Sequence, residues 1–229
     1  MKNYYVLLII GSLVLLGGCK KTNNAPDFHY DYFGLEEGRY IIYDVMDIVH
    51  DDQAAIKHDT SLYQLKTVWM GEYIDDQGRV GREFWRYTRD SSTDPWVLAD
   101  VWTGLIDGIH AELIEENQRK LKLVFSPTAQ KLWDANVYNP DQEYECYYRD
   151  IHGDTTINGT VFDTTCVVEI YSQSSLIDSV HLFETYAKGI GLINKFSKDI
   201  HFQFDTVSNV WFLDQGNEFY YTFVSAGFE

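Results

Sequence analysis

Two cysteines in the body of the chain, Cys146 and Cys166, are the first candidates for chemistry. Between them lies a polar stretch bounded by glycines, residues 153–159, which predicts a turn centred on Thr156. Such a turn brings the cysteines opposite each other on the apolar face of an antiparallel pair, within disulfide reach. We therefore expect a Cys146–Cys166 disulfide, with two free buried thiols as the alternative.

The spacing of other reactive residue types gives little support for catalysis. Neither cysteine has the basic or histidine-rich surroundings along the chain that favour a thiolate. The G-x-S-x-G pattern of serine hydrolases is absent from the sequence. No two histidines have the spacing of a zinc motif. They are scattered as His29, His50, His58, His110, His152, His181 and His201. We expect no catalytic residues, no metal and no cofactor.

Adjacent carboxylates occur at Asp51–Asp52, Asp75–Asp76 and Glu115–Glu116, and they raise the question of glycoside hydrolysis or calcium binding. Neighbouring side chains on a strand point to opposite faces of the sheet, so adjacent acids do not converge on one substrate. We interpret these pairs as solvated surface groups.

Aromatic residues recur at alternate positions, as in Phe219, Tyr221 and Phe223, and in Trp85 and Tyr87. Alternation places each set on one face of a strand. Exposed rings of this kind would stack on sugars or peptides, whereas buried rings would form a thick core. We favour the core and keep the binding platform as the alternative.

The elements that position these residues are predicted to be strands. Aromatic residues make up 16% of the chain and prolines number only four, a composition that favours a pleated, half-buried surface. Residues 62–74 and 78–88 form the clearest hairpin, because Gly78 supplies the positive φ of a tight connection. Residues 51–61 are interpreted as a loop or one helical turn, and residues 129–133 as a brief helix. Further strands are expected at residues 39–50, 95–103, 110–115, 119–125, 143–150, 160–171, 176–186, 190–196, 200–205, 210–213 and 218–224.

Short strands separated by frequent turn signals predict a single all-β antiparallel domain over residues 30–229. A curved meander, a barrel-like sheet and a sandwich are all compatible with this pattern. The chain carries 18 basic and 35 acidic residues, a formal net charge of −17. This balance argues against nucleic acid as a partner and against adhesion to anionic lipid.

The N-terminus has the layout of a secretory signal. Lys2 precedes an apolar run from Tyr4 to Leu16, shorter than the ~20 residues of a membrane-spanning helix. The run ends in Leu16-Gly17-Gly18-Cys19, which closely resembles the lipobox of bacterial lipoproteins. The resemblance implies a signal peptide at residues 1–18, cleavage before Cys19, a lipid on the Cys19 thiol, and a polar tether at residues 19–29. The membrane contact is then this lipid.

Several segments, taken in order, resemble an outer-membrane lipoprotein family of the Bacteroidota. They include the opening Tyr32–Val45, the segment Asp76–Arg79, and Tyr186-Ala187-Lys188-Gly189-Ile190-Gly191-Leu192. The resemblance implies location and fold but no enzymatic activity. Asp154-Thr155-Thr156 also resembles the acceptor pattern of O-glycosylation in this phylum, which makes Thr155, in the predicted turn, a candidate O-glycan acceptor.

The residues after Cys19 bear on localisation. Lys20, Lys21 and Thr22 lack the aspartate that marks retention at the inner membrane, and no acidic tract resembling a surface-export signal follows. The resemblance to outer-membrane lipoproteins therefore implies lipid anchoring in the cell outer membrane, with the periplasmic face favoured over the cell surface.

Three functions remain open at this point. A non-catalytic binding or structural role, with an unknown protein or glycan partner, predicts an exposed apolar or aromatic patch. A carrier enclosing an apolar ligand predicts inward-facing aromatics around a cavity. A glycan-processing hydrolase predicts carboxylates or histidines that converge in one cleft. We favour the binding or structural role and expect no enzyme activity.

Overall fold

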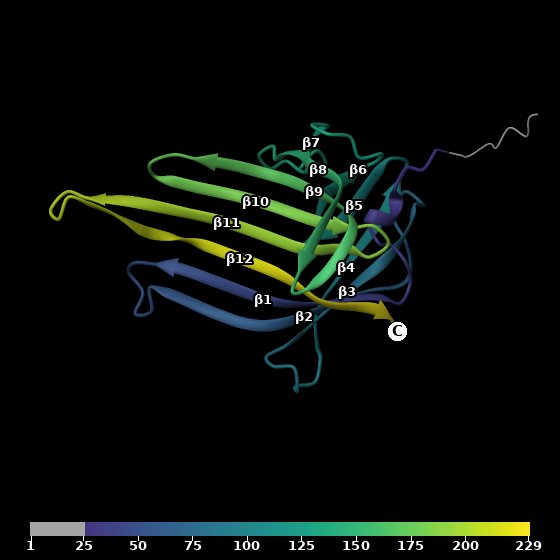
Figure 1. Cartoon of the computed structure of the whole chain (residues 1–229), viewed down its shortest axis with the longest axis horizontal. Helices are drawn as coiled ribbons and strands as arrows, with labels where there is room; N and C mark the ends of the chain where they lie inside the picture. The colour runs from purple at the N-terminus through teal and green to yellow at the C-terminus, as the bar shows by residue number, and fades with distance from the viewer. Residues whose placement is uncertain (1–25) are drawn as a thin grey trace, which may run out of the picture.

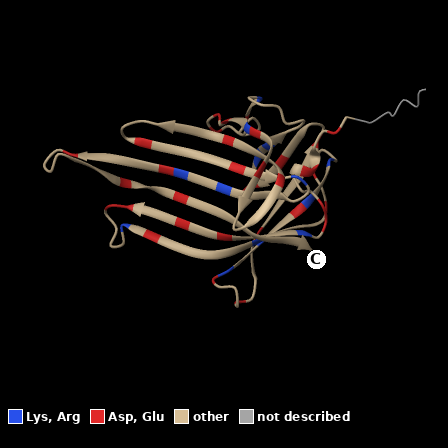
Figure 2. Ribbon diagram, in the orientation of Figure 1, with Lys and Arg blue, Asp and Glu red and all other residues tan. Residues whose placement is uncertain are grey.

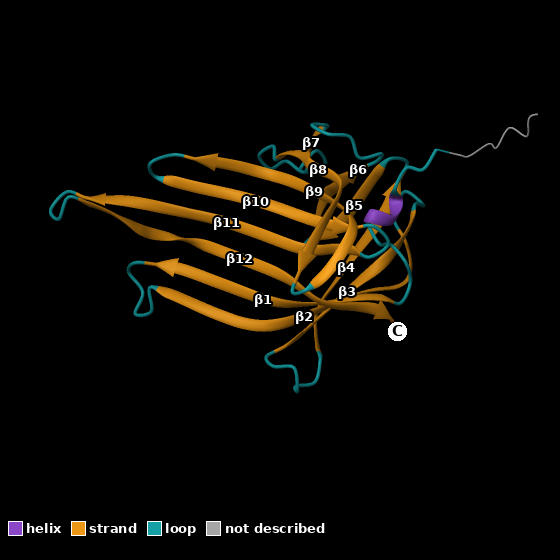
Figure 3. Ribbon diagram, viewed as in Figure 1, coloured by secondary structure: helices purple, strands orange, loops and turns teal. Residues whose placement is uncertain are grey.

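The computed structural model describes residues 26–229. This part of the chain is all β apart from one short 3-10 helix, η2 (Figure 3). The elements are η2 (Tyr30–Tyr32), β1 (Arg39–Asp51), β2 (His58–Ile74), β3 (Val80–Arg89), β4 (Val97–Asp107), β5 (His110–Glu115), β6 (Gln118–Val124), β7 (Leu132–Asp134), β8 (Glu145–Ile157), β9 (Thr160–Ser174), β10 (Asp178–Ala187), β11 (Gly191–Asp205) and β12 (Val210–Phe228). None of its helices has the length and apolar character needed to cross a bilayer. The predicted signal peptide, the predicted lipid attachment at Cys19 and tether residues 19–25 lie outside the described residues.

All strands belong to one antiparallel sheet, in the order β6-β5-β4-β3-β2-β1-β12-β11-β10-β9-β8-β7. The chain thus makes two meanders, β1–β6 and β7–β12, which are joined where the first and last strands pair, from Arg39 opposite Phe228 to Asp51 opposite Gln215. The prediction of a single antiparallel β domain is confirmed, and its shape is the curved, barrel-like one.

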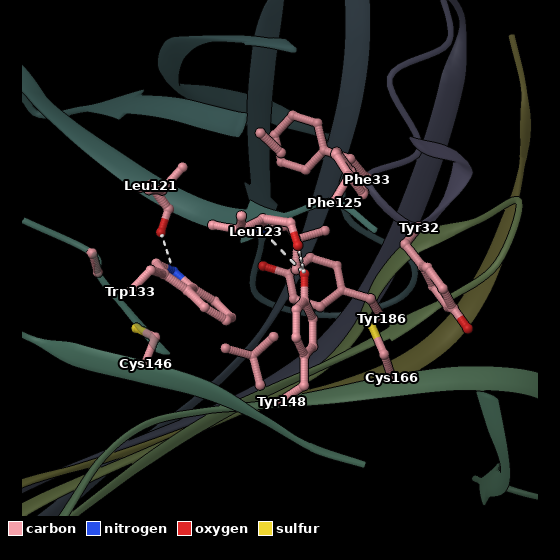
Figure 4. Close-up of a cluster of buried hydrophobic side chains, with 14 of the residues drawn as sticks. Tyr32, Phe33, Leu121, Leu123, Phe125, Trp133, Cys146, Tyr148, Cys166 and Tyr186 are labelled. Carbon is pink, nitrogen blue, oxygen red and sulfur yellow. Dashed lines mark hydrogen bonds between the residues drawn. The ribbon is translucent and has the colours of Figure 1, made fainter. Parts of the chain in front are cut away.

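The two edge strands, β6 and β7, meet and close the curve. The Leu121 N–H donates to the Ala135 carbonyl at 3.0 Å, and the Trp133 indole N–H donates to the Leu121 carbonyl at 3.1 Å. The Tyr148 hydroxyl bonds both the N–H and the carbonyl of Val124, each at 3.1 Å. Figure 4 shows these rings between the edges. Buried N–H and C=O groups at a strand edge need hydrogen-bond partners. Side chains supply them where β6 and β7 do not form continuous backbone hydrogen bonds.

Several expected elements are confirmed. The alternating residues 39–50 lie in β1, and the clearest predicted hairpin is β2–β3, with Gly78 at φ 75° in its turn. The brief helix expected at residues 129–133 is wrong, because Trp133 belongs to edge strand β7 and pairs with Cys146 on β8. The segments 190–196 and 200–205 are a single strand, β11, which continues through a polar stretch.

The core consists of two clusters of buried side chains. One lies at the closure and contains Tyr32, Phe125, Trp133 and Tyr148, which Figure 4 shows together. The other lies under β1, β2, β11 and β12 around Tyr43. The strands β2, β1, β12, β11, β10 and β9 run on beyond the barrel as a projecting sheet, and its hairpin tips are the β1–β2, β9–β10 and β11–β12 turns (Figure 1). The barrel end therefore encloses an interior, and the far end does not.

Candidate functional site

The barrel encloses a cavity of about 60 Å³ and, beside it, a second one of about 130 Å³. Four charged side chains line both cavities: Glu115, Lys122, Glu184 and Lys195. They come from β5, β6, β10 and β11, which lie on both sides of the closure. Charged groups inside a barrel are costly unless they are paired, so their arrangement identifies the candidate site.

One wall of the smaller cavity is aromatic. Trp69, Phe84 and Trp102 are cross-strand neighbours on β2, β3 and β4. The ring centroids of Trp69 and Phe84 lie 4.3 Å apart, and those of Phe84 and Trp102 lie 6.3 Å apart. The ring of Phe33, just after η2, lies 5.5 Å from Trp69. Gly104 lets the Trp69 ring approach, since a Cβ there would lie 2.5 Å from it. The wall offers flat apolar faces for a ligand.

The opposite wall is charged. Strand register places Glu184 of β10 opposite Lys195 of β11, and Lys195 opposite Tyr221 of β12. Lys122 reaches across from β6 and donates to Glu184 Oε1 at 2.6 Å. The Tyr186 hydroxyl donates to Glu184 Oε2 at 2.5 Å. Both carboxylate oxygens of Glu184 are therefore occupied.

Glu184 and Lys122 stabilise each other's charged forms. Only 1% of the Glu184 side chain is accessible. Burial is the largest effect on the pKa of Glu184 and acts to raise it, but the charges of Lys122 and Lys195 and the hydrogen bonds from Lys122 and Tyr186 together outweigh it and hold the carboxyl pKa below its usual range. Burial likewise acts to lower the pKa of Lys122, and the charges of Glu184 and Glu115 with the hydrogen bond to Glu184 together outweigh it and raise that pKa. Both shifts favour the charged forms of the pair.

Lys195 has no counter-ion as close as the one that Lys122 has in Glu184. Its Nζ lies 4.0 Å from Glu184 Oε1, an oxygen that already accepts from Lys122. Burial, followed by the like charge of Lys122, lowers the pKa of Lys195. Its amine makes no hydrogen bond with another residue among 26–229. Lys195 is thus a cation on the cavity wall whose side chain is 27% accessible, whose nearest carboxylate is shared with Lys122, and whose amine lies 5.7 Å from the centroid of the Tyr221 ring.

Arg86 links the two walls. Its guanidinium lies 3.8 Å above the Trp102 ring and donates to the Tyr221 hydroxyl at 3.0 Å. It also donates to Asp100 at 2.7 Å. These contacts hold the guanidinium between the two walls, so Arg86 fixes the shape of the cavity and holds Trp102 in place.

The cysteine pairing predicted from the sequence is not formed. Both cysteines are free and buried. Cys146 Sγ lies 3.9 Å from the Ile170 carbonyl, and Cys166 pairs with Ile151. The hairpin turn lies at Asn158-Gly159, both with positive φ, and not at Thr156, so the register differs from the expected one.

The buried thiols are also unreactive by their environment. Cys146 lines the larger cavity, where burial raises its pKa to about 12. Burial raises the pKa of Cys166 as well. A thiol with a raised pKa is a poor nucleophile at neutral pH.

The other predicted residues lie away from the cavity. Thr155 is half-buried in strand β8 opposite Phe162, so its expected position in a turn is wrong, whereas its modification stays a prediction. His50 and His58 face each other, with Nδ1 atoms 2.9 Å apart. Within residues 26–229, no three or more His, Cys, Asp or Glu side chains are grouped to hold a metal ion.

The aromatic residues singled out in the sequence divide between core and surface. Tyr221 and Phe223 are buried, as the core interpretation expects, and Tyr221 lines the cavity. The indole of Trp85 donates to Glu83, which makes it a surface pair on the wall of the barrel. The described tether residues contact the domain, since Lys188 pairs with Asp27 at 3.0 Å.

Lys122, Glu184 and Lys195 were missed in the sequence, and Glu115 was interpreted there as a solvated surface group, whereas it lines both cavities. Lys122 is a single charge between the apolar residues Leu121 and Leu123 of its strand. Such a charge faces either solvent or an interior, and alternation does not distinguish the two.

Comparisons of the chain with models of known protein families, with curated proteins and with solved structures found no match. The functional argument therefore rests on the geometry of the cavity.

Proposed function

We propose that this chain is a lipid-anchored, non-catalytic binding protein of the cell envelope, and that its barrel cavity holds a small ligand. One observation carries the proposal: an aromatic wall and an incompletely paired cation, Lys195, face the same cavity. Ligand sites are typically concave, mostly apolar and provided with a few placed polar groups. A carrier of a purely apolar ligand would not need this charged group. The cavity therefore favours a ligand that also carries a polar or charged group.

The charge arrangement favours binding over catalysis. Glu184, the most buried carboxylate of the cavity, is neutralised by Lys122 and bonded by Tyr186. A general acid or base needs a pKa near the working pH, and this carboxyl has the opposite shift. The proposed anchor is the lipid on Cys19 in the outer membrane, facing the periplasm, in line with the lipobox and the family resemblance.

Native mass spectrometry on protein purified from its own membranes tests the cavity. We expect a bound small molecule, retained by wild type and lost in Trp102→Ala, because the indole forms part of the wall. Trp211→Ala is the matched control, since Trp211 lies on a hairpin tip far from the barrel. A wild-type protein whose cavity holds only water, in every growth condition tested, would contradict the proposal.

Peptide mass spectrometry on the same material tests the anchor. The proposal expects an N-terminal fragment that begins at Cys19 and carries lipid. A mature chain that keeps residues 1–18, or one without lipid, would exclude the lipoprotein assignment.

A second surface favours docking to a protein. The three hairpin tips expose large apolar side chains, with Val207 94% and Leu176 79% accessible, along with Ile56 and Trp211. Acidic side chains mark the same tips (Figure 2), so the surface suits a partner with basic groups around an apolar centre.

Photo-crosslinking in cells tests this docking surface. A photo-reactive residue at position 207 should crosslink to one protein, and Leu176→Asp should abolish the adduct. The same probe at Val80, an exposed residue at the start of β3, is the control. Equal labelling at positions 207 and 80 would argue against a specific partner.

A further inference from the structure

The first described residues of the chain lie at the barrel end of the molecule, opposite the hairpin tips (Figure 1). They are fixed there by contacts with the domain. Lys188, in the turn between β10 and β11, donates to Asp27 at 3.0 Å. The Tyr30 ring meets Phe125 edge to face, with centroids 4.9 Å apart. The tether that leads back to Cys19 therefore joins the domain at its barrel end.

The tether is short compared with the domain. Asp27 is the eighth residue after Cys19, and eight fully extended residues span at most about 29 Å. Strand β12 has 19 residues and runs from a hairpin tip to the barrel end, which corresponds to ~60 Å at the usual rise per residue. A lipid on Cys19 therefore holds the barrel end close to the membrane, while the tips lie up to the length of β12 beyond it.

Apolar side chains are exposed around the point where the tether joins the domain. Phe28 stacks on Tyr30 with ring centroids 5.5 Å apart, and the two residues are 38% and 39% exposed. Ile109, which is 40% exposed, lies beside them, because its carbonyl accepts from the N–H of Phe125. A hollow of about 230 Å³ next to Tyr30 adds further apolar lining. The barrel-end patch consists of Phe28, Tyr30, Leu35, Ile106 and Ile109.

Carboxylates that border the barrel-end patch have basic partners. Asp31 and Glu36 line the same hollow. Lys188 Nζ lies 3.0 Å from Asp27 and 3.8 Å from Asp31, and Arg39 donates to Glu36 at 2.8 Å. The formal charge of the whole chain, −17, opposes contact with anionic lipid. At this end the paired charges leave the apolar side chains free to meet a surface of zwitterionic lipid.

From these observations we infer that the barrel-end patch rests on the bilayer that holds the anchor, and that the hairpin tips are directed away from it. The partner of the patch is a surface of zwitterionic phospholipid. Tyrosine rings favour the headgroup level of a membrane, and a contiguous exposed apolar patch marks a site of interaction. The inference rests on the proposed lipid anchor and does not depend on the cavity. It presents the tips to a partner away from the membrane.

Quenching of a fluorescent label by lipid measures which end of the molecule meets the bilayer. Bimane is attached to Ile109→Cys or, in a second protein, to Val207→Cys on a hairpin tip. The lipidated mature chain is placed in phosphatidylcholine vesicles, with and without lipids that carry a nitroxide. We expect the nitroxide to reduce the emission at position 109 about twofold, because an apolar residue on the surface lies at the headgroup level. The emission at position 207 should be unchanged.

Phe28→Ser tests whether the patch itself makes the contact. It removes the ring stacked on Tyr30 and should reduce the quenching at position 109 by about half. Val97→Ser is the matched control, because Val97 is 61% exposed but lies at the other end of β4 from the turn that holds Ile109. Equal quenching in Phe28→Ser and Val97→Ser would overturn the contact.

Flotation of the vesicles separates failure of the orientation from failure of the anchor. If the chain floats with the vesicles and position 109 is not quenched, the patch does not meet the lipid, and the orientation is wrong while the anchor stands. Equal quenching at positions 109 and 207 would mean that the molecule lies flat, which also overturns the orientation. If the mature chain does not float, the proposed anchor fails and the orientation fails with it.

Discussion

The interior of the barrel and the tips of the projecting sheet place polar and apolar groups in opposite ways. Inside the barrel, Glu184 and Lys122 are charged and shielded from water. On the tips, Val207 and Leu176 are apolar and exposed. Both arrangements occur on the same strands: β11 carries Lys195 in the barrel and the half-exposed Phe204 near its end. What a strand buries is therefore set by the strands that curve around it.

This contrast separates stability from function. Removing one partner of a buried ion pair destabilises the fold, because it leaves the other charge unpaired in the interior. An exposed apolar side chain on a tip contributes little to folding, because it remains in water in both states. Substitutions in the two regions should therefore change the stability of the protein by different amounts. Four substitutions test this difference.

The largest effect is expected from Lys122→Met. It leaves the buried Glu184 carboxylate without its closest cation and should lower the free energy of unfolding by about 3–5 kcal/mol. Lys57→Met on the first tip removes an exposed pair with Asp52 and should cost at most about 1 kcal/mol. Urea unfolding measures both. Equal losses in the free energy of unfolding would mean that the Lys122–Glu184 pair is as well solvated as the pair on the tip. The barrel interior and the tips would then not differ in this respect.

Gly104→Ala should have the next largest effect. The new Cβ would lie 2.5 Å and 2.8 Å from atoms of the Trp69 ring, so the aromatic wall must shift, at about 1–3 kcal/mol. Gly71→Ala is the matched control, because nothing lies within 4 Å of a Cβ there, and its stability should be unchanged or slightly higher. Near-ultraviolet circular dichroism should report the displaced indole only in Gly104→Ala. An unaltered spectrum would show that Trp69 is not held by this contact.

The loss of stability at acid pH should depend on the Glu184 carboxyl. Its folded pKa lies below the usual 4.5, so the folded state binds fewer protons than the unfolded one near that pH. The stabilisation is therefore complete above pH 4.5 and is lost as the pH falls through the folded pKa. Urea midpoints measured between neutral and acid pH should fall steeply for wild type and less steeply for Glu184→Gln. Parallel curves would contradict a native-state shift at this carboxyl.

Much of the fold could be predicted from the sequence, because alternation and turn residues are local signals. Residues 39–50 alternate with apolar side chains on both faces, which predicts a strand, and the structure has strand β1 there. The error at the cysteines has a local cause too. Asn158-Gly159 is a strong signal for a tight hairpin turn, and centring the turn on Thr156 displaced the register of β8 and β9.

The cavity could not be predicted in the same way. Glu184 and Lys195 lie on the paired strands β10 and β11, and Lys122 on β6 is brought close to them only by the meeting of edges β6 and β7. That closure depends on side-chain bonds, such as those of Tyr148, that no local pattern encodes. A lone charge in an apolar strand marks where such a site can form, and the partner strands decide whether it does.

The smallest effect is expected on the tips themselves. Val207→Ser removes an apolar side chain that is almost fully accessible and should change the free energy of unfolding by less than about 0.5 kcal/mol. Val45→Ser, at a buried position of β1, is the matched change inside the barrel and should cost several times more. Urea unfolding of the isolated protein measures both. If Val207→Ser is silent in stability but abolishes crosslinking from position 176, the tip residue serves contact with a partner and not the fold. If it destabilises the protein as much as Val45→Ser does, the tip is part of the packed structure, and the division between an interior that folds and a periphery that docks would fail.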